Sequence, residues 1–570
     1  MPTGIQKRRS GNRGRSACPG AAKKSAGRLW LFLPICPLVL CLRGDQPLTL
    51  RTNVHVVEVS IVATGSKGAP AEGLRSRDFR VWDNKVEQTI ASFQEVSSQA
   101  GSAGAELPPN TYSNRIVEAG PAGLGKTDRP QVLSMILLDA INTKYRFQTV
   151  FRRAAEKILG GLPPGENVAV YAMGSKLRIV HDFSSDRASL LATLRAYHGE
   201  VPDRDDLLED LDLGTPRIPG LTPGNAPCGH RTERETPFEL IAKNARILDT
   251  LATLEAIAKH VKGIPGRKNL LWMTGAFPLV VGQLALEGPI IAPSAGSNRR
   301  SPFEDHRAYA AEVNRTLTLL NDANVSVYPI DARGLSCSPD AIINIGTMRD
   351  FADATGGKAF YNRNDLATGV RSALDDVREV YELTYSPNPI AQDGAYHTIR
   401  VQSARRGVQL RYRRGYYAPG QGDAGEVAAA DRLTAVLSSP LDASEIGVQA
   451  SLGQVSGGDV SVAIHIDPAD LNLTRNADSW TGALHLEAMQ LGAAGERWSG
   501  VSQTAEINLE PATYQRALRQ GLPFEMKFPR DPAAVAVRIG VVDERGGHAG
   551  SLTVPLPPLP TPPGAKSTGR

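Results

Sequence analysis

Cysteine is scarce in this sequence, with five residues among 570. Cys18, Cys36 and Cys41 lie within the first 43 residues, which leaves Cys228 and Cys337 for the rest of the chain. Two cysteines cannot form the disulfide framework of a small secreted domain, and they cannot supply the four ligands of a structural zinc site. Cys228 and Cys337 therefore either form one disulfide bond or remain as two free thiols.

A membrane-length apolar run is also missing from the start of the chain. The apolar stretch Leu29–Leu42 has 14 residues, whereas a spanning helix needs about 20. It follows Met1–Arg28, which contains eight basic residues and no acidic one, and this order is typical of a secretory signal. We expect residues 1–43 to be a leader that exports the protein to the periplasm, the cell surface or the extracellular space. The leader is either cleaved or retained as an N-terminal anchor, which is the one membrane contact that we expect.

Positive charge is not in surplus beyond this leader. Met1–Arg28 supplies more than the whole net charge of +5, so the rest of the chain is close to neutral. A nucleic-acid-binding protein normally carries a basic patch or stripe on its folded part. The charge pattern therefore excludes nucleic acid as an expected partner.

Residues 129–380 alternate between apolar strand-like runs and helical segments. Val132–Leu138 is predicted to be a buried strand, Phe147–Leu159 a helix, Val168–Met173 a strand and Glu239–Val261 a long helix. This alternation predicts an α/β domain with a parallel sheet. Residues 199–237 interrupt it with an acidic run, which lacks the ligand spacing of a calcium loop and is interpreted as a solvated insertion.

β-branched segments surround this domain. Those in residues 44–96 and 381–419 are too few to bury a sandwich core separately, so we predict that they combine into one N-terminal β-sandwich into which the α/β domain is inserted. Repeated strand-like runs in residues 426–556 predict a C-terminal β-sandwich. Residues 557–570 are predicted to be a disordered tail.

Residues 97–128, rich in Gly, Ser, Ala and Pro, are predicted to be a linker. Within this linker, Gly120–Thr127 (GPAGLGKT) matches the spacing of a phosphate-binding P-loop. Such a loop needs a strand before it and a helix after it, so that backbone N–H groups face the phosphates. Here Asp128-Arg129-Pro130 follows and then a strand, which favours a coincidental match. A nucleotide-binding protein or enzyme that uses this loop is the alternative function.

The chain resembles the von Willebrand factor A (VWA) family, within it the VWFA-related group known from acidobacteria. The stretches that carry the resemblance are Leu74–Phe93 (LRSRDFRVWDNKVEQTIASF), Leu137–Thr143 (LLDAINT), Pro265–Pro278 (PGRKNLLWMTGAFP), Val327–Gly334 (VYPIDARG), Ala354–Phe360 (ATGGKAF) and Tyr396–Tyr417. The resemblance covers about residues 50–420. It implies a doubly wound, Rossmann-like α/β domain with a metal-ion-dependent adhesion site (MIDAS) at the carboxyl ends of the strands.

In the family, that site uses D-x-S-x-S on a first loop, a Thr on a second and an Asp on a third. Asp139 matches the first Asp and Thr143 the second Ser, but Ile141 occupies the position of the first Ser. The second-loop candidate is Thr250. The third loop keeps Thr274, but Gly275 stands where the family has Asp. Asn142 and Asp331 are further candidates from neighbouring positions.

Two interpretations of this degenerate site follow. The residues either bind Mg²⁺ or Ca²⁺ through oxygen atoms, or they satisfy backbone groups at the strand end and cap the next helix. No arrangement of residues indicates catalysis, so we expect a non-enzymatic protein. It would bind an unknown protein partner in the envelope or extracellular space, and act in adhesion or assembly. A structural envelope scaffold without metal is the remaining alternative.

Overall fold

The computed structural model describes residues 56–66, 68–97, 107–115, 132–161, 166–200, 237–275, 277, 279, 309–335, 339–365, 379–388, 393–418, 428–453, 458–476 and 478–558. The predicted leader, the P-loop-like Gly120–Thr127, Cys228 and Cys337 lie outside these residues, as do most of the acidic insertion and of the C-terminal tail.

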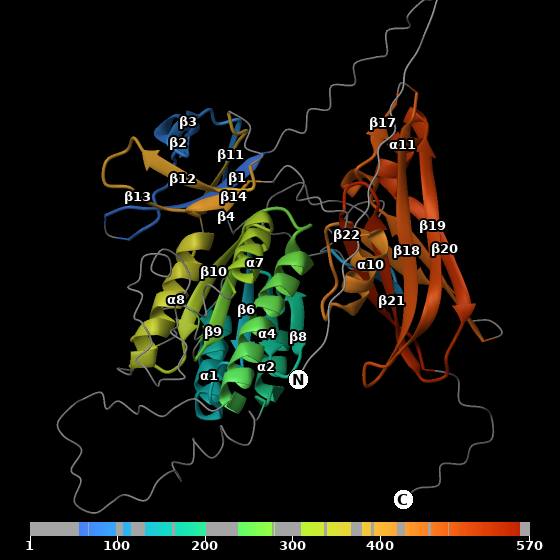
Figure 1. Cartoon of the computed structure of the whole chain (residues 1–570), viewed down its shortest axis with the longest axis horizontal. Coiled ribbons are helices and arrows are strands. Elements are labelled where there is room, and N and C mark those ends of the chain that lie inside the picture. Colours follow the sequence, from blue (N-terminus) through green and yellow to red (C-terminus); the bar gives the residue numbers. More distant parts are fainter. Residues whose placement is uncertain are drawn as a thin grey trace, which may run out of the picture. The chain divides into compact units, whose positions relative to one another are not determined.

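A five-stranded sheet forms the centre of the α/β domain (Figure 1). Its strands are β6 (Leu133–Asp139), β7 (Val168–Met173), β8 (Leu177–Ser184), β9 (Lys268–Thr274) and β10 (Val325–Asp331). They lie in the order β10-β9-β6-β7-β8, with β8 antiparallel and the other four parallel. Every residue of β6, β7, β9 and β10 is buried, as the continuous apolar runs of a sheet covered on both faces require.

Helices pack on both faces of this sheet. They are α1 (Tyr145–Gly161), α2 (Arg187–Ala196), α4 (Pro237–Val261), α7 (Ala310–Asp322) and α8 (Pro339–Thr355). Helices α1 and α2 share one hydrophobic cluster with the sheet, through residues such as Phe151 and Leu194. Helices α4, α7 and α8 share the opposite cluster, through residues such as Leu254, Leu320 and Phe351.

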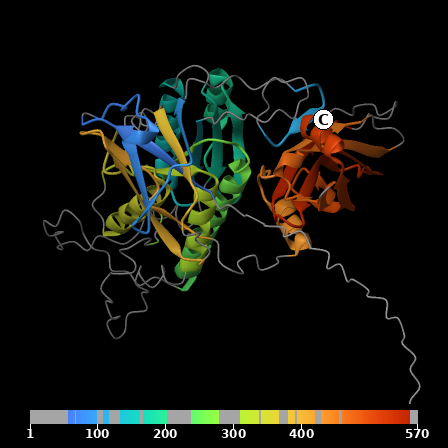
Figure 2. The same ribbon diagram turned by 90° about the horizontal axis from the view of Figure 1, so that it is seen from above.

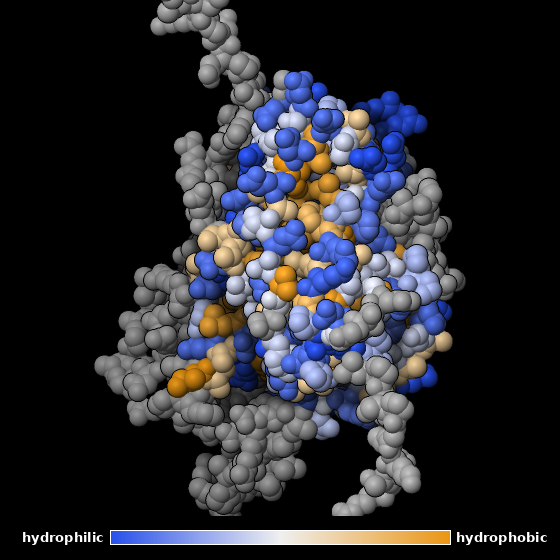
Figure 3. Space-filling view, turned by 90° about the vertical axis from the view of Figure 1, so that its right-hand side faces the viewer, coloured by the Kyte–Doolittle hydropathy of each residue, from blue (hydrophilic) through white to orange (hydrophobic). Residues whose placement is uncertain are grey.

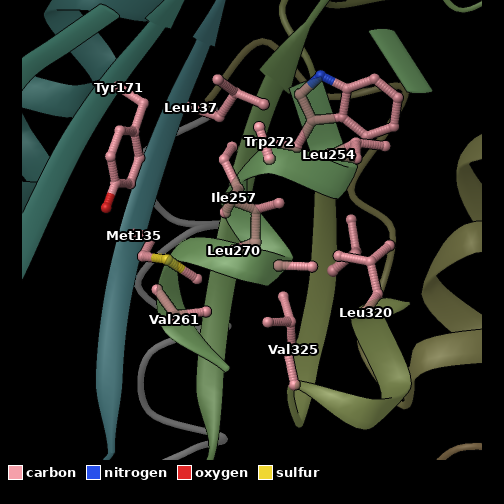
Figure 4. Close-up of a cluster of buried hydrophobic side chains, with 14 of the residues drawn as sticks. Met135, Leu137, Tyr171, Leu254, Ile257, Val261, Leu270, Trp272, Leu320 and Val325 are labelled. Atoms are coloured by element: carbon pink, nitrogen blue, oxygen red, sulfur yellow. The ribbon is translucent and has the colours of Figure 1, made fainter. Parts of the chain in front are cut away.

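The second cluster contains a fully buried tryptophan (Figure 4). Trp272 of β9 lies edge-on to Phe351, with 5.9 Å between the ring centroids, and close to Leu254 of α4 in the same cluster. Burying an aromatic ring of this size stabilises a core strongly. The packing also fixes the direction of the Trp272 side chain.

A β-sandwich is formed by strands from two distant parts of the chain (Figures 1 and 2). Its elements are β1 (Val57–Thr64), a 3-10 turn (Ser76–Asp78), β2 (Phe79–Asp83), β3 (Val86–Gln88), β4 (Ser92–Ser97), β11 (Glu379–Tyr385), β12 (Tyr396–Ser403), β13 (Gln409–Arg411) and β14 (Gly415–Tyr417). The two sheets have the orders β13-β1-β11-β4 and β14-β12-β2-β3. Each sheet combines strands from before and after the α/β domain, which is the pairing that an inserted domain requires.

A second sandwich follows in the C-terminal part. Its elements are α10 (Ala429–Ser438), β15 (Val448–Leu452), β16 (Asp459–Ile466), a 3-10 turn (Pro468–Asp470), β17 (Thr474–Arg475), β18 (Trp480–Gly492), β19 (Arg497–Leu509), α11 (Pro511–Gln520), β20 (Leu522–Pro529), β21 (Ala534–Asp543) and β22 (Ala549–Pro555). Figure 3 views it from the side of β19 and β20 and shows a band of apolar surface. Partly buried side chains of this sandwich, such as Trp498, Val501 and Phe524, pack against its core.

The structure differs from two predictions about the connecting segments. The predicted linker 97–128 contains strand β5 (Thr111–Ser113), which pairs with β15 of the C-terminal sandwich. The sheet that receives it has the order β20-β16-β15-β5. In addition, β11 begins at Glu379, two residues before the predicted boundary of the α/β domain at residue 381.

Candidate functional site

Three predicted site residues end neighbouring strands of the α/β sheet. Asp139 is the last residue of β6, Thr274 of β9 and Asp331 of β10. The register pairs Asp331 with Thr274, and it pairs the residues that precede Thr274 and Asp139 with each other. Ligands of open α/β sheets bind outside the carboxyl ends of the strands, so these three residues lie where a site is expected.

The Asp139 carboxylate is fully buried and surrounded by hydrogen-bond donors. Its Oδ1 accepts from the backbone N–H of Asn142 at 2.9 Å, and its Oδ2 accepts from the indole Nε1 of Trp272 at 2.9 Å. The side-chain Nδ2 of Asn142 lies 3.2 Å from Oδ1 and 3.0 Å from Oδ2. The Thr274 side chain also hydrogen-bonds to this carboxylate. A carboxylate offers about four lone-pair positions, and these donors fill them.

The remaining hydroxyl groups of the predicted site are also engaged. Thr143 Oγ1 accepts from the backbone N–H of Gly275 at 2.7 Å. Thr250, on α4, donates from Oγ1 to the backbone oxygen of Arg246 at 2.7 Å and accepts from Asn142 Nδ2 at 2.8 Å. Thr250 thus lies within helix α4 and not on a loop, and hydrogen bonds join the first loop both to this helix and to the third loop.

Glycine at position 275 permits the close approach of the third loop to the first. A Cβ atom at this position would lie 3.1 Å from both the backbone oxygen of Asn142 and the Cα of Thr143. Such contacts are tighter than most side chains tolerate, so the acidic residue of the family would require the loops to separate. Glycine at position 275 is therefore compatible with the close contact between these two loops.

Asp331 faces its own loop and not the other candidates. Its Oδ1 accepts from Arg333 N at 3.0 Å and from Arg333 Nε at 2.9 Å, while Oδ2 accepts from Nη2 at 2.8 Å. The Asp331 carboxylate is 1% exposed, so this bidentate pair satisfies a buried charge. The structure therefore does not bring Asp331 together with Asp139 as a ligand.

These residues do not fit a hard divalent cation. Mg²⁺ and Ca²⁺ need several oxygen lone pairs directed at one point, but the groups nearest to Asp139 direct N–H and O–H donors at it. Ile141, in the position of the first family Ser, packs against the hydrophobic cluster that contains Trp272. Among the residues that the structure describes, no group of three His, Cys, Asp or Glu side chains could hold a metal ion.

Two side chains that support the site do not stand out in the sequence. Trp272 lies two residues before Thr274 in β9, so both point to the same face of the sheet and reach Asp139. Gln148 of α1 is buried and donates from Nε2 to the backbone oxygens of Thr143 and Glu200 at 3.1 and 3.0 Å. Because residues two apart in a strand point to the same face, the sequence could have indicated that Trp272 lies beside Thr274. No sequence pattern indicates that Gln148 contacts the site.

Burial of Asp139 predicts a pH-dependent stability. Burial raises its pKa from 3.8 to about 6, although hydrogen bonds from Thr274, Asn142 and Trp272 lower it in part. Between these values the folded protein binds more protons than the unfolded chain, so stability falls as the pH rises, by roughly 3 kcal/mol in total. The variant Asp139→Asn, which is neutral throughout, should lack this contribution. Urea unfolding between about pH 4 and 7 compares the two proteins, and identical slopes would contradict the expectation.

Comparison with known proteins gives similarity only at the level of solved structures. No family model and no curated protein matches the chain. A von Willebrand factor type A protein from Catenulispora acidiphila is 11% identical; the match covers 61% of this chain and 80% of that one, with a TM-score of 0.22. An aerotolerance-related membrane protein from Bacteroides fragilis is 10% identical, with 43% and 98% covered and a TM-score of 0.22.

A third similar structure is proximal thread matrix protein 1 from the mussel byssus, with a zinc-occupied MIDAS motif. It is 10% identical, and the match covers 45% of this chain and 48% of that one at a TM-score of 0.22. This chain thus spans about half the length of the byssus protein. Over the described parts of the chain, no helix has the length and apolarity that crossing a membrane requires.

Proposed function

We propose that the chain is an exported VWA-type protein without enzymatic activity, which binds another protein at the carboxyl-end face of a doubly wound α/β sheet. This binding would act in adhesion or envelope assembly and would not require a divalent cation. The observation that carries the proposal is the combination, at one face, of a closed polar network with exposed large apolar side chains.

Four such side chains, which we call the apolar rim, belong to elements that reach this face. Tyr145 begins α1 directly after β6, and Leu335 follows β10; they are 43% and 67% exposed. Ile241 and Leu248 lie in α4 before Thr250, which contacts the β6 loop, and are 66% and 44% exposed. Groups of exposed apolar side chains on a soluble protein are typical of protein-binding surfaces.

Cation independence follows from the donors around Asp139. In a metal-dependent adhesion site, a carboxylate of the partner completes the coordination of the cation. Here the carboxylate is already saturated by Asn142, Trp272 and Thr274. Recognition would therefore depend on the apolar rim.

The test is a capture experiment from envelope extract with the full-length protein, with and without chelator. We expect a partner that is retained equally in both conditions and is lost with the double variant Ile241→Ser and Leu335→Ser. The matched control is Leu518→Ser, an exposed leucine of α11 that is 37% exposed and belongs to the C-terminal sandwich. Affinity for the captured partner should fall at least about ten-fold in the double variant, as expected for apolar hot spots. Equal capture by the double variant would exclude this face, and loss of capture with chelator would exclude cation independence.

A further inference from the structure

We propose that the side-chain amide of Asn142 is an internal substitute for a cation at Asp139. In this role it occupies the space beside the carboxylate and joins the first loop to helix α4, which a bound ion would otherwise join. The inference goes beyond the proposed function, because it concerns how the face is held together and stands whether or not a protein binds there.

The position of the amide nitrogen is the first argument. Asn142 Nδ2 lies within 3.2 Å of three oxygen atoms: both carboxylate oxygens of Asp139 and Oγ1 of Thr250. These oxygens come from β6 and from α4, and Asn142 is 108 residues from Thr250 along the chain. One polar group thus links the oxygens that the resemblance assigns to a metal.

The orientation of the amide follows from the hydrogen-bond pattern. Thr250 uses its hydroxyl proton on the backbone oxygen of Arg246, so its Oγ1 can only accept from Asn142. A buried carboxylate likewise only accepts. Both neighbours therefore require the nitrogen of the amide and not its oxygen, and this fixes a group that is otherwise ambiguous.

Local sequence explains why Asn142 can reach this place. Its own backbone N–H donates to Asp139 Oδ1 at 2.9 Å, which forms a tight turn after β6. Within this turn Ile141 packs toward the hydrophobic cluster, so the next side chain turns toward the carboxylate. A serine at position 141 would have no such apolar anchor.

Charge compensation is the consequence for the molecule. The Asp139 carboxylate is 0% exposed, and a buried carboxylate is costly unless it is paired or hydrogen-bonded. Donors from Asn142, Trp272 and Thr274 supply part of this compensation without an ion. The loops then keep one arrangement whatever the calcium or magnesium concentration outside the cell.

The experiment measures thermal unfolding of the full chain in chelator and in MgCl₂ or MnCl₂. The wild-type protein should unfold at the same temperature in both solutions. Asn142→Ala should unfold earlier in chelator and recover part of the loss with either salt, because oxygens of Asp139 and Thr250 become available to the ion. A cation at ten times its Kd raises the folded-to-unfolded ratio roughly eleven-fold.

Two further variants make the result specific. Asn142→Ser, which keeps a hydroxyl group at this position, should also unfold at a higher temperature with the cations than in chelator. It provides a second test if the alanine variant folds poorly. Asn142→Ala combined with Asp139→Asn should lose the cation response. The inference is overturned if the single variants respond no more than the wild type, or if the wild type itself is stabilised through Asp139.

Discussion

Replacement of Arg267 by methionine is expected to reduce the free energy of unfolding by about 3–5 kcal/mol, because several buried acceptors lose their donor at once. Arg267 is 1% exposed. It donates to Asn269 Oδ1 at 3.1 Å, to Tyr328 Oη at 3.1 Å and to the backbone oxygens of Gly356 and Ser60 at 2.9 and 3.4 Å. Methionine fills much of the space but leaves these acceptors buried without their donor.

The consequence should extend beyond the α/β domain, because Ser60 belongs to β1 of the N-terminal sandwich. Hydrogen–deuterium exchange can distinguish destabilisation of the α/β domain from destabilisation of the N-terminal sandwich, since protection reports local stability. We expect faster exchange in both β9 and β1. Arg80→Met is the control, as Arg80 is 72% exposed in its pair with Glu87 and such pairs contribute at most about 1 kcal/mol. Equal protection in Arg267→Met and Arg80→Met would show that the buried network contributes nothing.

Arg267 also shows a limit of prediction from sequence. The basic pair Arg267-Lys268 before a strand predicts a solvated turn, yet both residues are buried. Lys268 donates from Nζ to the backbone oxygen of Ala323 at 2.9 Å, and burial lowers its pKa to about 8. The cause is tertiary: the amino end of β9 meets the end of α7 and the N-terminal sandwich. No local pattern carries that information.

Local signals predicted several elements of the α/β domain closely, although they did not predict the antiparallel strand β8. The apolar run of β7 has the predicted bounds Val168–Met173, and α4 begins two residues before its predicted start at Glu239. Asp186 caps α2 through its side chain, as the Ser185-Asp186 pair predicts. Buried strands and helix caps depend on a few neighbouring residues, so they can be predicted from a single sequence.

Strand β5 lies in a segment that its composition predicts to be a linker. Its three residues lie in a stretch rich in Gly, Ser and Pro, and their pairing with β15 depends on contacts made by the two residues that follow. Asn114 donates to the backbone oxygen of Ala443 at 2.7 Å, and Arg115 pairs with Asp470 at 2.8 Å. These partners are more than 300 residues away along the chain. A short strand held by such contacts has no periodicity to detect.

The sequence predicted where Asp139 lies in the fold, but not which groups surround it. The end of a buried strand indicates where Asp139 lies, because strand ends of parallel sheets meet at one edge. Whether its neighbours offer lone pairs or protons depends on side-chain direction. That direction is set by the anchoring of Ile141 and by the packing of Trp272, and both are properties of the assembled core.

Replacement of Asp83 by alanine is expected to cost about 3–5 kcal/mol in the N-terminal sandwich, because it leaves several buried donors without an acceptor. Asp83 is 3% exposed. Its Oδ2 accepts from Tyr416 Oη at 2.7 Å and from Tyr385 Oη at 3.0 Å, and its Oδ1 lies 2.8 Å from His397 Nδ1. The second ring nitrogen of His397 lies 3.2 Å from Asp393. Faster hydrogen exchange in β2 and β12, with α4 unchanged, would be the expected readout.

The same network makes the sandwich sensitive to alkaline pH. Burial lowers the pKa of His397, but hydrogen bonds to Asp83 and Asp393 outweigh it and raise the pKa above the ordinary value. A histidine with a raised pKa in the folded state stabilises fully below about pH 6.5, and its contribution is lost as the pH rises through the folded-state pKa. Tyr385 and Tyr416 face the same carboxylate, and burial raises the pKa of each, so they remain protonated donors throughout this range.

Exchange protection of β12 should therefore fall as the pH rises, after correction for the intrinsic exchange rate. His397→Gln should remove this dependence, while the exposed control His198→Gln should keep it. If β12 keeps the same corrected protection on both sides of the transition, His397 does not carry a charge in the folded sandwich.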